Sequence, residues 1–174
     1  MTLNKNQAIQ FLKKNHAKLE NVINGLSENQ ISQDIISVKW ITKDIIAHIS
    51  AWNLELKIAI DDLLNDKKPW FINEEELTEA EFNAKETKKR KDWSLDQILD
   101  EWQTLFEQLI QRIMNLSKSE WEYQTPFEWT KDMPVTVSSL FDYLYRGEGH
   151  EGGHAKQIEE FYKKRDPQNT KNDD

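Results

Sequence analysis

The chain has 174 residues, of which 37% are hydrophobic and 31% are charged, and its formal net charge is -8. This length is typical of one domain with a substantial core, and the apolar content is too high for a disordered chain. The negative charge gives no broad basic face for a phosphate backbone, so nucleic acid is not expected as a partner. Without cysteine the chain has no disulfide, thiolate ligand or cysteine nucleophile.

The N-terminal sequence MTLNKNQAIQ lacks the apolar core of a signal peptide. No stretch approaches the roughly 20 apolar residues that a transmembrane helix needs. The absence of cysteine also fits a reducing compartment. We therefore expect a soluble, cytoplasmic protein that does not associate with membranes.

Four segments have apolar residues at steps of three and four, which is the period of an amphipathic helix. The third begins at a serine followed three residues later by glutamine, a typical N-cap signal. No segment shows the sustained alternation of a strand, so the predicted class is all-α, an antiparallel four-helix bundle. The segments are Asn4 to Leu26, Thr42 to Asn65, Ser94 to Leu116, and from after Pro134 to Phe161.

The connection between the second and third predicted helices, residues 66–93, is long for a bundle loop. Its charged stretch EEELTEAEFNAKETKKRK predicts a short helix, and the KKRK run at 88–91 is expected to be a solvated helix end. Residues 1–166 are therefore predicted to form one bundle domain. Residues 167–174 have nothing to bury and are predicted to be a disordered C-terminal tail.

Two short signals occur twice and raise the question of an internal duplication. LSENQI at 26–31 and LSKSEW at 116–121 each follow a predicted helix. Trp40 begins WITKD before the second helix, and Trp129 begins WTKD before the fourth. Matches this short fit either duplication or chance. Under duplication, the second and fourth helices would be equivalent elements.

The sequence GEGHEGGH at 147–154 contains four of the five glycines. Since a helical glycine costs about 1 kcal/mol relative to alanine, the cluster needs a local reason. One reason is close approach of backbone, water or substrate, where larger side chains would collide. The alternative is that the glycines break the fourth helix. In that case the spacing of the histidines among them has no geometric meaning.

Three histidines are candidate metal ligands. On a helix, His150 and His154 would stand about 5 to 6 Å apart at their β-carbons and could share one ion. His48, on the inner face of the second helix, is the candidate third ligand. Three imidazoles leave coordination positions open, as catalytic sites require, and suit zinc, nickel, manganese or iron. His16 shares a face with core leucines and is assigned to packing or pocket lining.

The segment HEGGH also fits H-E-x-x-H, the zinc metalloprotease motif in which the glutamate is the general base. Against a protease, only twenty residues follow His154 to supply a third ligand. No strand is evident to hold an extended peptide. A metalloprotease is therefore the weaker alternative.

The segment WITKDIIAHISAWN at 40–53, followed about a hundred residues later by HEGGHAKQI, resembles the DinB/YfiT-like superfamily of bacterial four-helix bundles. Within it, the closest resemblance is to the branch that includes ClbS and DfsB, and it extends from the first helix to about Tyr162. The resemblance implies that His48, His150 and His154 match the family's metal triad, commonly nickel or zinc, and that homodimers form. Members include thiol-dependent transferases and isomerases and, in the ClbS branch, a hydrolase that protects against a genotoxin.

We therefore expect a metal-binding protein that activates water or a thiol on a small electrophilic or toxic molecule, as a hydrolase or thiol-dependent transferase. Glu151 is a candidate general base because a carboxylate beside the metal could take up a proton. Trp52, Tyr143 and Arg146 are candidate pocket residues. The alternative is a non-enzymatic bundle that binds a small ligand or serves as a dimeric stress protein.

Overall fold

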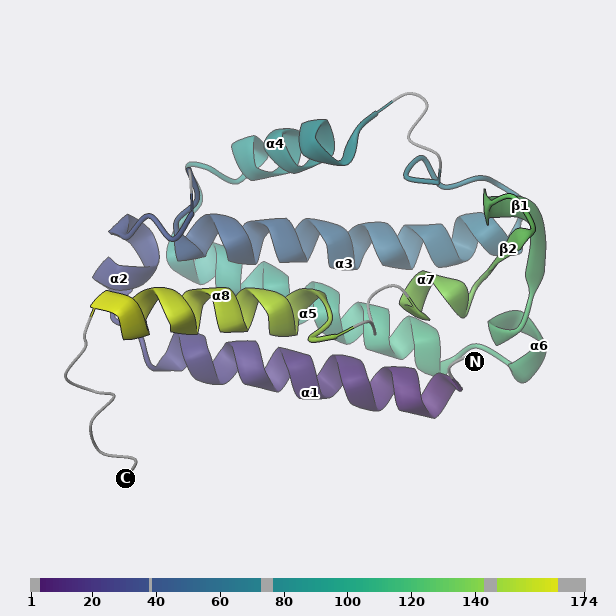
Figure 1. Ribbon diagram of the computed structural model, residues 1–174, viewed down its shortest axis with the longest axis horizontal. Coiled ribbons are helices and arrows are strands. Elements are labelled where there is room, and N and C mark those ends of the chain that lie inside the picture. Colours follow the sequence, from purple (N-terminus) through teal and green to yellow (C-terminus); the bar gives the residue numbers. More distant parts are fainter. Residues whose placement is uncertain (1–3, 38, 73–76, 143–146, 166–174) are drawn as a thin grey trace.

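Four long helices lie alongside one another in the computed structural model, which describes residues 4–37, 39–72, 77–142 and 147–165 (Figure 1). The most extensive helix contacts are those of α3 with α5 and of α1 with α8. Both ligand-bearing segments of the sequence therefore lie within one set of packed helices. The four are α1 (Lys5–Asn24), α3 (Thr42–Leu64), α5 (Leu95–Met114) and α8 (His150–Arg165).

Shorter elements complete the described fold. Helix α4 lies in the long connection and runs beside α3 (Figure 1). Strands β1 and β2 form a two-stranded antiparallel sheet in which Gln124 lies opposite Thr136. The bounds are α2 (Glu28–Gln33), α4 (Glu79–Lys89), α6 (Lys118–Trp121), β1 (Gln124–Thr130), β2 (Met133–Thr136) and α7 (Ser139–Asp142).

The mostly helical class and the first three predicted helices are confirmed, with ends that differ by at most two residues. Ser94 is the N-cap of α5, and its hydroxyl accepts a hydrogen bond from the backbone N–H of Gln97. The short charged helix is confirmed as α4, which begins after the N-cap Thr78. The hairpin of β1 and β2 was not predicted. Its two-residue turn places Asp132 at a φ of 66°, in the left-handed region that tight hairpins use.

The prediction of one continuous helix from after Pro134 to Phe161 is wrong. That segment contains β2, the short helix α7 and then α8, which starts only at His150. Gly147 and Gly149 have φ values of 76° and 67°, which a right-handed helix cannot contain. Two of the glycines therefore do precede the helix rather than lie within it. His150 and His154 still share α8, so their four-residue spacing keeps its geometric meaning.

The duplicated signals lie in different local structures. Ser27 and Ser117 each cap a short helix, α2 and α6, so the repeated LS motif has the same role twice. Trp40 lies directly before α3, whereas Trp129 lies within β1. The second pair of matches thus gives no structural support for equivalent helices.

Two buried apolar clusters hold the helices together. One joins α3 and α5 to α6, β2 and α7 at the end of the molecule that includes Leu63 and Phe141. The other joins α1, α3, α5 and α8 around Ile49 and Trp102. Each fully buried side chain of this size contributes about 1.5 to 3 kcal/mol. The second cluster includes Ala155 and Ile158 of α8, so it packs the helix that contains His150 and His154 into the core.

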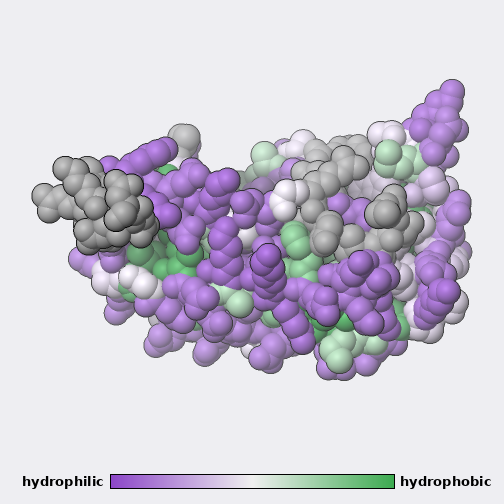
Figure 2. Space-filling model, turned by 60° about the horizontal axis from the view of Figure 1, so that its bottom comes forward, coloured by the Kyte–Doolittle hydropathy of each residue, from purple (hydrophilic) through white to green (hydrophobic). Residues whose placement is uncertain are grey.

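The opposite faces of the helices are polar. Figure 2 shows one face of the molecule, on which hydrophilic residues dominate and hydrophobic residues form small separate patches. Within the described residues, no helix combines the length and the apolar character needed to cross a membrane. The predicted C-terminal tail at 167–174 lies outside the described residues.

Gly152 of α8 lies against Asn15 of α1. A β-carbon there would stand 2.5 Å from Oδ1 and 3.0 Å from Cγ of the buried Asn15 side chain. We therefore predict that Gly152→Ala lowers the free energy of unfolding by about 1 to 3 kcal/mol, measured by urea denaturation of the metal-free protein.

The control is Gly153→Ala, since a β-carbon at this neighbouring position meets no atom within 4 Å. The higher helix propensity of alanine should then stabilise the protein by up to about 1 kcal/mol. Equal effects of the two substitutions would contradict the close approach of α8 to α1.

Candidate metal centre

Side chains from two helices bring three histidines together. His48 comes from α3, whereas His150 and His154 come from α8, and one nitrogen of each lies within 4.8 Å of the other two. Nε2 of His48 is 2.8 Å from Nε2 of His150. The ring centroids of His48 and His154 are 5.3 Å apart. One ion bound at about 2.0 to 2.1 Å from each nitrogen can bridge such a group after small side-chain rotations.

The local structure explains why these rings converge. In α3, His48 lies among the core residues Ile45 and Ile49, on the face that packs against the rest of the molecule. In α8, the backbone N–H of Gly153 donates to the carbonyl of Gly149 at 2.9 Å, so helical hydrogen bonding starts directly after the positive-φ glycines. His150 and His154 therefore stand one above the other on the first turn of α8.

Burial keeps all three imidazoles neutral at neutral pH. Burial and the nearby His154 lower the pKa of His48 from 6.5 to about 3. Burial has the largest effect on the pKa of His150, and the charges of the other two histidines act in the same direction. Together they lower this pKa well below 6.5. Burial also lowers the pKa of His154, although Gln157 and Glu151 oppose it. A neutral imidazole has the free lone pair that a metal ion needs.

The tautomer of His154 follows from its hydrogen bond. Nδ1 lies 3.0 Å from Oε1 of Gln157, and because an amide oxygen only accepts, the proton belongs on Nδ1. The lone pair is then on Nε2. A histidine ligand oriented by a hydrogen bond from its second nitrogen is the usual arrangement in metal sites.

Glu151, between the two α8 histidines, is buried and accepts hydrogen bonds from all three of the other long helices. Nδ1 of His16 on α1 donates to Oε2 at 2.9 Å. Oε1 accepts from Nδ2 of Asn53 on α3 at 3.1 Å and from Nε1 of Trp102 on α5 at 3.2 Å. This one carboxylate therefore fixes the first turn of α8 relative to α1, α3 and α5.

His16 is the cationic partner of Glu151. Its Nε2 lies 3.0 Å from Oε1 of Gln103, and the amide of Gln103 is oriented by donating to Glu20. Burial lowers the pKa of His16, but the hydrogen bonds and charges of these neighbours raise it above 6.5 overall. The ring also stacks on Phe106 with centroids 3.6 Å apart, which agrees with the predicted packing role.

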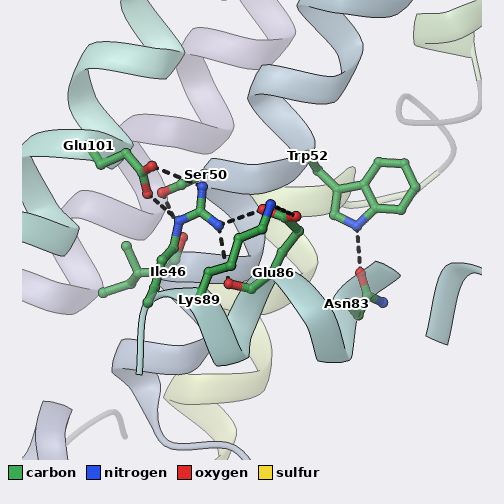
Figure 3. Close-up of polar contacts among 8 residues, drawn as sticks. Ile46, Ser50, Trp52, Asn83, Glu86, Lys89 and Glu101 are labelled. Carbon is green, nitrogen blue, oxygen red and sulfur yellow. Dashed lines mark hydrogen bonds and ion pairs between the residues drawn. The ribbon is translucent and has the colours of Figure 1, made fainter. Parts of the chain in front are cut away.

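Sequence reasoning missed the partners of Glu151, Asn53 and Trp102 among them. An inward-pointing histidine at position 16 was the available signal, since a buried imidazole needs partners for both nitrogens. Of the predicted pocket residues, Trp52 donates from Nε1 to Oδ1 of Asn83 at 2.9 Å (Figure 3). Its ring also contacts that of Phe82. Tyr143 and Arg146 lie outside the described residues.

Ion pairs join the C-terminal end of α4 to α5, and they correct one prediction. Arg90, in the KKRK run, is buried rather than solvated. Its Nε and Nη2 donate to Glu101 of α5 at 2.6 and 2.9 Å, and its Nη1 donates to Oε2 of Glu86 at 2.8 Å. Lys89 pairs with the same Glu86 within α4, and Figure 3 shows these two residues together with Glu101 of α5. The bidentate pair of Arg90 and Glu101 fixes both the position and the orientation of the C-terminal end of α4 relative to α5.

The family model of the DinB superfamily matches residues 7–158, so the chain belongs to this superfamily. Among solved structures, it is similar to a mycothiol-dependent maleylpyruvate isomerase, with 11% sequence identity and a TM-score of 0.70. A histidine-to-alanine mutant of that enzyme gives 11% identity and a TM-score of 0.69. Each match covers 90% of this chain but only 61% of the isomerase chain, and it shows a shared fold. No curated protein matches this chain.

The lowered histidine pKa values predict how stability depends on pH in the metal-free protein. The unfolded chain takes up protons near pH 6.5, whereas folded His48 resists protonation until about pH 3, so the free energy of unfolding falls as the pH falls below 6.5. At pH 5, His48 alone should contribute a loss of about 2 kcal/mol. The raised pKa of His16 acts in the opposite sense, because its stabilisation is present below pH 6.5 and is lost as pH rises through the folded pKa.

Urea denaturation of the wild type and of His48→Gln at pH 7 and pH 5 measures this effect. The variant should lose less stability than the wild type over this interval. An equal loss in both proteins would show that His48 is not held neutral by burial.

Proposed function

We propose that the protein is a metal-dependent enzyme in which His48, His150 and His154 hold one nickel or zinc ion. The observation that supports this most directly is the convergence of three neutral ring nitrogens from α3 and α8. Membership of the DinB superfamily and a fold shared with a thiol-dependent isomerase add support. The proposed reaction is hydrolysis or thiol transfer on a small electrophilic or toxic molecule.

The choice of ion follows from the donors. Imidazole nitrogen suits zinc and nickel, whereas magnesium and calcium prefer oxygen ligands. The candidate ligand group in the described residues consists of histidines alone. A bound ion of this kind would supply a Lewis acid, with positions left open for a substrate or thiol. The protein's contribution is to keep three imidazoles deprotonated and oriented in a buried site.

Glu151 enters this proposal with two alternative roles. As a general base, it would accept a proton from the attacking water or thiol. As an anchor, it would hold α8 so that the histidines meet. Its oxygens already accept three hydrogen bonds, which favours the anchor and also argues against the metalloprotease hypothesis, in which the glutamate must be free to act on water.

The proposal includes the remaining expectations from the sequence. We place the chain in the ClbS/DfsB branch, as an antiparallel four-helix bundle over residues 1–166 that forms a homodimer in the cytoplasm. Tyr143 and Arg146 remain proposed pocket residues. Trp52 is proposed to act through Asn83, to which it donates a hydrogen bond.

Metal loading tests the ligand assignment. We predict that protein stripped of metal and dialysed against nickel or zinc retains about one equivalent, and that His48→Ala, His150→Ala or His154→Ala each weakens binding by at least about 100-fold. Isothermal titration calorimetry and elemental analysis measure both quantities. Retention below about a tenth of an equivalent by the wild type, or an unchanged affinity in His48→Ala, would refute the site.

The same loaded and stripped samples separate an enzyme from a binding module. The proposal predicts turnover of a thiol-conjugation or ester-hydrolysis substrate by loaded protein only. Metal-independent binding of small electrophiles without turnover would instead identify the non-enzymatic alternative.

Glu151→Gln distinguishes the two roles of the carboxylate. If Glu151 is an anchor, we predict a loss of about 3 kcal/mol in stability, because the buried His16 loses its anionic partner. Metal affinity should fall with it. If Glu151 is only a base, kcat falls while stability and metal affinity stay at the wild-type values.

The matched control is Glu148→Gln, the same chemical change three residues earlier. Glu148 is exposed and pairs with Lys18 and Lys156 at the surface, so its replacement should change neither stability nor metal affinity appreciably.

A further inference from the structure

The Nδ1 atom of His48, the ring nitrogen that faces away from His150, has no hydrogen-bond partner among the described residues. Nε2 faces His150 at 2.8 Å, so Nδ1 points to the other side of the ring. Nδ1 is buried and, within the described part of the chain, has no partner at hydrogen-bond distance. If Nε2 supplies its lone pair to an ion, the ring proton must be on Nδ1. A buried N–H without an acceptor is unfavourable, so this atom requires one.

Asn83 of α4 is the side chain placed to provide that acceptor. Its Oδ1 accepts from Nε1 of Trp52 at 2.9 Å (Figure 3). Trp52 is one helical turn after His48 on the same face of α3. A carbonyl oxygen accepts two hydrogen bonds, so one lone pair remains. Asn83 lies on α4, which packs against α3, and its side chain is at the level of Trp52.

We propose that Asn83 is a positioning residue of the metal centre, whose Oδ1 accepts a hydrogen bond from Nδ1–H of His48 and thereby fixes the ring with Nε2 toward the ion. This inference rests on the proposed function, since it assumes that His48 is a ligand. Trp52 fixes the direction of the Asn83 amide by donating to the same oxygen. Partners of this kind orient histidine ligands and raise their basicity.

The attachment of α4 makes this role possible. Arg90 joins the C-terminal end of α4 to Glu101 of α5 by a bidentate ion pair. Phe82, the neighbour of Asn83, is buried in ring contacts with Trp52 and Trp70. The amide of Asn83 is therefore held by contacts on both sides along the helix. The long connection between α3 and α5 thus supplies a residue that orients a ligand from α3.

Zinc affinity of full-length variants tests the proposal. Asn83→Leu removes the acceptor at similar volume and should weaken zinc binding by roughly 10- to 100-fold. Asn83→Asp retains an acceptor oxygen and should bind zinc at least as tightly as the wild type does. Trp52→Phe should show a smaller loss than Asn83→Leu. The control Lys85→Leu, an exposed position on the same helix, should bind zinc as the wild type does.

A spectroscopic measurement separates positioning from a merely structural effect. In zinc-loaded wild type, nitrogen-15 NMR of the imidazoles should show the His48 proton on Nδ1 and in slow exchange with water. In Asn83→Leu, that exchange should be faster. If Asn83→Leu does not fold, the wild-type spectrum and the Asn83→Asp and Trp52→Phe affinities decide the question.

Two results would overturn the inference: zinc affinity of Asn83→Leu within about twofold of the wild type, or coordination of His48 through Nδ1. Its failure is distinct from failure of the proposed function. If His48→Ala abolishes zinc binding but Asn83→Leu does not weaken it, only the role of Asn83 is wrong. If His48→Ala leaves zinc binding intact, the metal centre itself is wrong.

Discussion

The hydrogen bonds to the carboxylate of Glu151 connect all four long helices at one point of the core. A buried carboxylate without partners is strongly unfavourable, so the position of Glu151 is restricted to a point where α1, α3 and α5 each supply a donor. Breaking a buried charge pair costs about 3 to 5 kcal/mol, a large part of a typical stability of about 5 to 15. Because His150 and His154 flank Glu151 on α8, whatever fixes Glu151 also fixes two of the three candidate ligands. Asn53 comes from the same helix as His48, so the same network also positions the helix of the third candidate ligand.

The glycines of GEGHEGGH serve this arrangement in different ways. Gly147 and Gly149 provide left-handed backbone before α8, so that the helix can begin at a ligand. Gly152 allows α8 to pack on Asn15 without a side chain between the two helices. Gly153 meets no neighbour that would exclude a β-carbon, and the structure gives no packing reason for it. The cost of glycine in a helix is therefore offset by packing at Gly152, whereas no contact offsets it at Gly153.

The sequence was most informative where local rules apply. The period of apolar residues predicted α1, α3 and α5, a capping signal predicted the start of α5, and a charged stretch in the long connection predicted α4. The four-residue spacing of His150 and His154 predicted their common face. The inward position of His48 on the second helix indicated it as the third member, and the family resemblance implied the same residue. The hairpin was missed because β1 and β2 each contain a proline and show no sustained apolar alternation. The break before α8 depends on backbone torsions at Gly147 and Gly149 that composition alone does not specify.

Contacts between distant segments could not be predicted from the sequence. His16 and Glu151 are 135 residues apart, and Asn53 and Glu151 are 98 apart, so their pairing depends on how all four helices pack. Arg90 was expected in water because charge runs usually are solvated, but two carboxylates from different helices converge on it. Asn83 has no sequence signal at all, since its place beside α3 follows from the attachment of α4.

The central claim is that one ion contacts all three imidazoles. X-ray absorption spectroscopy of the zinc-loaded wild type and of His48→Ala measures this directly, because ordered imidazole ligands give characteristic outer-shell scattering. The account predicts three imidazole ligands in the wild type, all at about 2.0 to 2.1 Å, and two in the variant. The same imidazole number in both proteins would show that His48 does not bind the ion and would contradict the account.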